Sequence, residues 1–117
     1  MALKSNPVRI HKVSSILQRA LGDVFLIDTN KLFAKGGITV TALYLGADLG
    51  TAKVYLSFAI DGDKDNMLKK VVQHSSTIRK MLGIRIAGKM RKVPQLRFYI
   101  DNAFNNATRL HQLIDAL

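Results

Sequence analysis

The sequence contains no cysteine, no tryptophan and no glutamate, so all eight acidic residues are aspartates. Without cysteine there are no disulfides, thiol nucleophiles, zinc–thiolate sites or iron–sulfur clusters. The lack of glutamate excludes a paired-glutamate acid/base enzyme and disfavours a polyacidic metal cage, so we expect no cofactor and no metal. No apolar run approaches 18 residues and the N-terminus, MALKSNPVRI, has no hydrophobic export region, so neither membrane spanning nor export is predicted.

The charge balance indicates the kind of partner. The 117 residues carry 18 Lys and Arg against 8 Asp, a net charge of +10 with a pI near 10.2. A chain of this length fits one compact domain, which we expect to span residues 1–117. Small basic domains most often neutralise phosphates, so we expect a cytoplasmic nucleic-acid-binding protein rather than a membrane-surface or acidic-protein binder.

The first half of the chain predicts one helix and a hairpin. Asn6 followed by Pro7 is a helix-start signal, and apolar residues then recur at helical spacing as far as Leu26. Residues 28–37 form a loop ending in two glycines. Residues 38–45 are β-branched and aromatic, residues 46–50 form a turn, and residues 52–60 alternate strictly between apolar and other side chains. This alternation predicts a sheet with one buried face and one open face that carries Lys53 and Tyr55.

The second half predicts two helices, a strand and a final helix. The apolar stripe after residue 66 is Met67, Leu68, Val71, Val72, Ser75, Ile78, Met81 and Leu82. Gly83 is expected to break this helix, a short second helix to cover residues 84–92, and a strand to cover 96–100. A last amphipathic helix is expected over residues 103–117. The predicted fold is α+β, with a three-stranded mixed sheet and helices packed on one face.

Three motifs suggest other chemistry, but each fails a specific requirement. Residues 61–66 (DGDKDN) resemble the start of a calcium loop, yet Asn66 and Val72 stand where glycine and a bidentate glutamate are needed. Residues 83–90 match a phosphate-binding loop until Met90 replaces the magnesium-binding Ser or Thr. The three histidines are too scattered for a metal site, and no orienting acid supports a hydrolase or nuclease at residues 74–76.

Charge segregation is the strongest signal. No acidic residue occurs in residues 66–100, which hold nine of the 18 basic residues. A solvated helix face normally intersperses acids among its bases. The predicted phosphate-binding surface therefore extends over this segment. The open sheet face with Lys53, Tyr55, Arg97 and Tyr99 is the next candidate.

Four segments resemble the ribosome-binding factor A family. Residues 38–41 (ITVT) with 47–57 (ADLGTAKVYLS) are similar to its hairpin, and residues 78–83 (IRKMLG) to its helix-ending I-R-x-x-L-G. Residues 93–98 (VPQLRF) resemble V-P-E-L-x-F, and residues 12–19 its opening helix. The order of elements likewise resembles a type II K homology (KH) domain.

The resemblance implies a non-enzymatic, cold-adaptation factor that binds the immature small ribosomal subunit and assists late maturation of its ribosomal RNA. It implies a monomeric KH-like RNA-binding protein with a role in ribosome biogenesis and rRNA processing, and no membrane partner. The residues expected to contact RNA are Lys69, Lys70, Ser75, Ser76, Arg79, Lys80, Arg85, Lys89, Arg91 and Lys92.

The chain departs from the family pattern in two places. Residues 74–76 (HSS) stand where the family has an A-x-G kink and other KH domains have a G-x-x-G clamp, and Gln95 replaces a glutamate. Without the clamp, recognition is expected to depend on phosphates and RNA shape rather than on base edges. The alternative is a generic single-stranded RNA-binding KH module.

Overall fold

The computed structural model describes residues 7–33, 37–59, 63–90 and 92–102. Helix α1 (Pro7–Asp23) continues into a π-helical turn, η2 (Val24–Asp28), and a short 3-10 helix, η3 (Asn30–Phe33). The hairpin strands β1 (Ile38–Leu45) and β2 (Thr51–Phe58) follow, then α2 (Lys64–Gln73), α3 (Ser75–Ile86) and β3 (Gln95–Ile100). The predicted final helix over 103–117 lies outside the described residues.

The three strands form one mixed sheet in the order β1-β2-β3. β1 and β2 are antiparallel, as a short hairpin connection requires, whereas β2 and β3 are parallel because two helices intervene. A register shift between Val40 and Ala42 interrupts the ladder of β1. The predicted α+β class and mixed sheet are confirmed.

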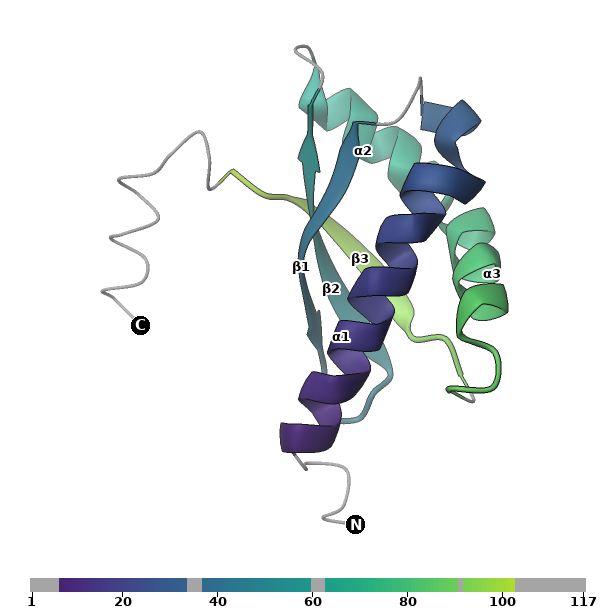
Figure 1. Ribbon diagram of the computed structural model, residues 1–117. Coiled ribbons are helices and arrows are strands. Elements are labelled where there is room, and N and C mark those ends of the chain that lie inside the picture. Colours follow the sequence, from purple (N-terminus) through teal and green to yellow (C-terminus); the bar gives the residue numbers. More distant parts are fainter. Residues whose placement is uncertain (1–6, 34–36, 60–62, 91, 103–117) are drawn as a thin grey trace, which may run out of the picture.

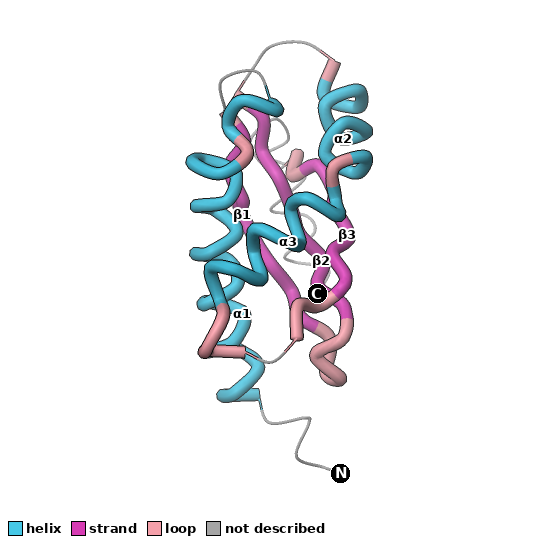
Figure 2. The backbone as a smooth tube through the Cα atoms, turned by 90° about the vertical axis from the view of Figure 1, so that its right-hand side faces the viewer, coloured by secondary structure: helices cyan, strands magenta, loops and turns pink. Residues whose placement is uncertain are grey.

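Helices α1, α2 and α3 lie on the same side of the sheet (Figures 1 and 2). The core forms between them, where Leu17 and Leu21 of α1, Ile78 and Leu82 of α3, and Val54 of β2 are fully buried. Along β2 and β3 alternate residues are buried, as the sequence pattern predicts. None of the helices in the described residues lies on the opposite face of the sheet.

The predicted break at Gly83 is wrong, because the long helical segment bends at His74. His74 leaves helical geometry with φ −99° and ψ 16°, while its backbone N–H still donates to the carbonyl oxygens of Lys70 and Val71. Its ring Nδ1 lies 2.9 Å from the Lys70 carbonyl oxygen, and its ring meets Phe33 edge-on with centroids 5.6 Å apart. Contact with the 3-10 helix thus helps hold the bend where the sequence shows no breaking residue.

Gly83 has a packing role within α3 instead. A Cβ atom at this position would lie 3.2 Å from Cγ2 of Val93, so the missing side chain lets the segment before β3 approach the helix. α3 ends at Ile86, and Gly88 turns the chain with φ +88° while Lys89 N–H donates to the Ile86 carbonyl oxygen. The predicted second helix over 84–92 is therefore wrong.

Val72 is a further correction to the predicted stripe. It is 52% exposed, whereas Val71, Ile78 and Leu82 are fully buried. The bend at His74 changes the direction of the helix, so a single stripe drawn through both halves includes a residue that faces solvent.

Candidate nucleic-acid interface

The basic residues of the segment 66–100 divide by exposure. Those with exposed side chains in α2, in α3 and in the segment between α3 and β3 are Lys69, Lys80, Lys89 and Lys92, which we call the lysine surface; Arg97, on β3, is also exposed. Ser76 is also exposed, whereas Lys70, Ser75, Arg79 and Arg85 are half-buried, and Arg91 lies outside the described residues. The sequence-based list therefore combines cations that face water with cations that the fold uses internally.

Arg79 is a structural cation. Its Nε donates to the carbonyl oxygen of Pro94 at 3.1 Å, and its Nη2 donates to that of Val93 at 2.8 Å. These two bonds tie α3 to the segment that leads into β3. Because these donors are already engaged, Arg79 positions the neighbouring segment, and its capacity to contact a phosphate is reduced.

Arg85 is neutralised by an acid from the distant end of the first helical segment. Its guanidinium donates to both carboxylate oxygens of Asp28, at 2.7 and 2.9 Å. That hydrogen bond is the main reason why the pKa of Asp28 is lowered and the pKa of Arg85 is raised. The fold thus supplies Arg85 with an acidic partner that the local sequence lacks, and contact of Arg85 with RNA stays a prediction.

Two of the lysines border a groove of about 580 Å³. It lies between α1, the β1–β2 turn and the segment from Lys89 to Gln95, and its lining includes the basic side chains Arg9, Arg79, Lys89 and Lys92. Asp48 also borders it and accepts a hydrogen bond from Gly50 N–H at 2.9 Å. Sequence reasoning missed Arg9, because its position in the chain does not reveal that α1 begins beside the segment before β3.

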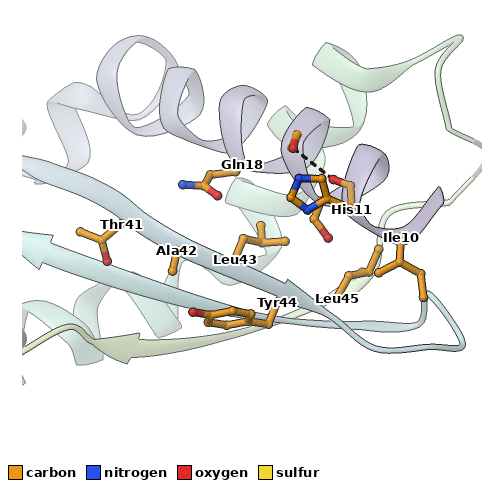
Figure 3. Close-up of a pocket in the computed structure, with 10 residues that line it drawn as sticks. Ile10, His11, Gln18, Thr41, Ala42, Leu43, Tyr44 and Leu45 are labelled. Atoms are coloured by element: carbon orange, nitrogen blue, oxygen red, sulfur yellow. Dashed lines mark hydrogen bonds between the residues drawn. The ribbon is translucent and has the colours of Figure 1, made fainter. Parts of the chain in front are cut away.

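A second hollow, between α1 and the edge strand β1, has different chemistry (Figure 3). Its volume is about 520 Å³, and its polar lining includes His11, Ser15 and Gln18 but no Lys, Arg or Asp. Ser15 Oγ donates to the carbonyl oxygen of His11 within the same helix. Nothing in this lining pairs a nucleophile with a base and an orienting acid.

Two features are absent from the described part of the chain. It contains no group of three or more His, Cys, Asp or Glu side chains that could hold a metal ion. None of its helices is long and apolar enough to span a membrane.

The helix–hairpin–helix–helix–strand order, with a parallel β2–β3 pair and a lysine-rich α2–α3 surface, defines a KH-like domain of type II. The family profile described as ribosome-binding factor A matches residues 9–114. The chain belongs to the ribosome-binding factor A family.

Curated relatives and solved structures agree with this assignment. Ribosome-binding factor A of Cytophaga hutchinsonii is 32% identical over 94% of this chain and 83% of its own length. That of Chlorobium phaeobacteroides is 37% identical over 92% of this chain and 91% of its own.

The fold is similar to two structures of the Thermus thermophilus ribosome-binding factor A. Its crystal structure superposes with a TM-score of 0.61 at 23% identity, over 78% of this chain and 94% of that one. A homology model fitted into a cryo-electron-microscopy map of a 30S complex gives 0.61 at 22% identity, over 78% and 93%.

Proposed function

We propose that this chain is a cytoplasmic, single-domain assembly factor that binds the immature small ribosomal subunit and assists late maturation of its ribosomal RNA. The lysine surface would contact the RNA, and no catalytic step is involved. The observation that carries the proposal is the separation of cations in α2, α3 and the segment before β3. The fold engages Arg79 and Arg85 internally and leaves Lys69, Lys80, Lys89 and Lys92 exposed.

This separation matches what phosphate binding requires. Lysine ammonium groups are mobile point charges that follow a phosphate backbone without reading bases. The segment that carries them contains no acid, so the acids near the surface come from elsewhere in the chain: Asp28 pairs with Arg85, and Asp48 borders the groove beside Lys89 and Lys92. Binding through such a surface would recognise the shape and charge of folded RNA. The Thermus thermophilus relative described in a 30S complex supports the small subunit as the partner.

The experiment is cosedimentation with immature small subunits. The double variant Lys80→Glu with Lys89→Glu should lose binding strongly while its melting temperature stays within about 2 °C of the parent, because exposed charges contribute little to folding. Lys31→Glu with Lys64→Glu changes the net charge equally but lies outside the lysine surface, so it should bind more tightly than the first variant. Equal loss in both variants would indicate a general charge effect and would reject this surface.

The alternative function is a generic single-stranded RNA-binding KH module. It predicts that the chain binds free oligonucleotides but does not cosediment with subunits. The same assay, run with an excess of unstructured RNA as competitor, separates the two functions. An assembly factor keeps its subunit binding at competitor concentrations that saturate the generic module.

A further inference from the structure

The three tyrosines of the chain lie together on the open face of the sheet. Tyr44, Tyr55 and Tyr99 come from β1, β2 and β3. The rings of Tyr55 and Tyr99 are stacked, with centroids 5.3 Å apart and planes 25° apart, and Tyr44 meets Tyr55 edge-on at 5.7 Å. Figure 3 shows Leu43 directed toward α1 and Tyr44 on the other side of the strand. We call these three residues the tyrosine platform.

The two ends of the tyrosine platform are open to solvent. Tyr44 is 62% exposed and Tyr99 is 37% exposed, while Tyr55 is half-buried between them. Each outer ring therefore presents a free aromatic surface beyond the contact with Tyr55. An exposed aromatic ring has the size and the chemistry that an unpaired nucleobase needs for stacking.

Two cations border the platform. Lys53 and Arg97 are register partners on neighbouring parallel strands, and each is two residues before a platform tyrosine, so both lie on the open face. Both are exposed. Asp101, just after β3, accepts a hydrogen bond from Thr41 Oγ1. Aromatic rings beside exposed cations form a surface that suits a nucleic-acid strand.

The distribution of aromatic residues argues against simple core packing. The four phenylalanines of the described chain, Phe25, Phe33, Phe58 and Phe98, are all buried beneath the sheet or under the helices. Among the aromatic residues of the described chain, tyrosines lie on the open face of the sheet and phenylalanines do not. Cross-strand ring pairs do stabilise a sheet, yet that role alone needs neither the exposure of both outer rings nor the adjacent Lys53 and Arg97.

We propose that the tyrosine platform binds an unpaired RNA segment, with bases stacked on Tyr44 and Tyr99 and phosphates held by Lys53 and Arg97. This inference extends the proposed function, on which it rests, by adding a second RNA contact on the side of the sheet opposite the helices. The lysine surface follows folded RNA, whereas the platform selects strands whose bases are free to stack. A subunit whose RNA is not fully folded offers such strands.

Charge argues for RNA over a second copy of the chain. A symmetric pairing of two open faces would bring two copies of Lys53 and Arg97 together in a protein that already carries +10. A polyanion with flat bases relieves that repulsion and fills the exposed ring surfaces.

Tyrosine fluorescence reports on this surface directly, because the chain has no tryptophan and its three tyrosines all belong to the platform. The protein is titrated with an unstructured RNA decamer, a duplex of the same sequence, and inorganic polyphosphate of equal charge. After correction for absorbance by the RNA, the decamer should quench tyrosine emission, and the duplex and polyphosphate should not. Equal quenching by polyphosphate would overturn base stacking as the cause.

Substitution identifies the ring as the binding group. Tyr99→Thr keeps strand propensity but removes the ring, and it should weaken decamer binding roughly 5- to 150-fold, the range for one lost base–aromatic stack. Tyr99→Phe keeps the ring and should bind within about 3-fold of the parent. Thermal melting of both variants checks that the sheet is intact. Tyr99→Thr binding like the parent, or a self-association that hides the tyrosines, would refute the proposal.

The two proposals fail in distinguishable ways. If the Lys80→Glu, Lys89→Glu variant no longer cosediments with subunits while Tyr99→Thr still binds the decamer, the proposed role of the lysine surface is supported and that of the tyrosine platform is refuted. If Tyr99→Thr no longer binds the decamer while the Lys80→Glu, Lys89→Glu variant still cosediments with subunits, the proposed role of the tyrosine platform is supported and that of the lysine surface is refuted.

Discussion

Arg79 and Lys80 are adjacent cations on α3, and the structure predicts opposite consequences for replacing them. Arg79 donates two hydrogen bonds to the carbonyl oxygens of Val93 and Pro94, and Lys80 is exposed. Methionine is a suitable replacement at both sites, because it keeps the length and helix propensity of the side chain while removing its charge and donors. Arg79→Met should destabilise the fold, whereas Lys80→Met should weaken RNA binding.

The magnitude follows from the two lost bonds. A hydrogen bond from a charged group contributes about 1.5–3 kcal/mol, and the half-buried position of Arg79 favours the lower end for each bond. We therefore expect Arg79→Met to lower the free energy of unfolding by about 2–4 kcal/mol. Lys80→Met should change it by less than about 0.5 kcal/mol, as for other exposed sites.

Urea unfolding followed by circular dichroism measures both effects on one scale. With a slope of about 1.5 kcal/mol per molar urea, the Arg79 variant should unfold at roughly 1.3–2.7 M lower urea than the parent. Subunit cosedimentation, at a temperature where both variants are folded, gives the binding half of the comparison. Equal unfolding midpoints for the two variants would refute the division of cations into structural and RNA-facing groups.

Four further predictions rest on other features. If the four lysines of the lysine surface each contact one phosphate, log K against log[salt] for subunit RNA should slope near −2.8 to −3.6, and a flat salt titration would exclude the surface. The pKa of Asp28 is lowered below its ordinary 3.8, so its ion pair stabilises the fold above that pH and is lost as pH falls through the folded value. Asp28→Asn should accordingly be less stable than the parent at pH 7, and the gap in urea midpoint should close toward pH 3; a gap independent of pH would contradict this. Leu82→Ala, at a fully buried site, should cost about 2–5 kcal/mol by urea unfolding, while Val72→Ala, at an exposed site, should cost less than about 0.5 kcal/mol, and similar costs would contradict the corrected stripe. EDTA should leave the melting temperature unchanged, and a drop of several degrees would reveal a metal site.

The strands and the first helix could be predicted closely because their signals are local. Residues 38–45 form β1 with the predicted bounds, and β2 and β3 each start within one residue of the prediction. Period-two alternation and helical spacing both arise from burying one face of a regular element, so each is visible in the sequence alone. The parallel pairing of β2 with β3 followed from the intervening helices.

The helix bend could not be predicted in this way. Gly83 is the residue with the strongest local tendency to break a helix, yet the segment stays helical there and bends at His74. The bend depends on contact between His74 and Phe33, which are distant in the chain, and Gly83 makes room for Val93. Intrinsic propensity is a weak signal when tertiary packing opposes it.

The sequence by itself predicted the class of partner, because charge and acid content do not depend on how the chain folds. It also determined the α+β order of elements and placed Lys53, Tyr55, Arg97 and Tyr99 on an open face. Only the tertiary structure decided which cations are engaged within the fold and which remain exposed to a partner. Arg85 meets Asp28 across 57 positions of the chain, and Arg79 meets carbonyl groups beyond the end of its helix. Tyr44 likewise joins Tyr55 and Tyr99 only after the strands pair. The physical reason is that hydrogen bonds, ion pairs and ring contacts act over a few ångströms in space, whereas the sequence specifies only separation along the chain.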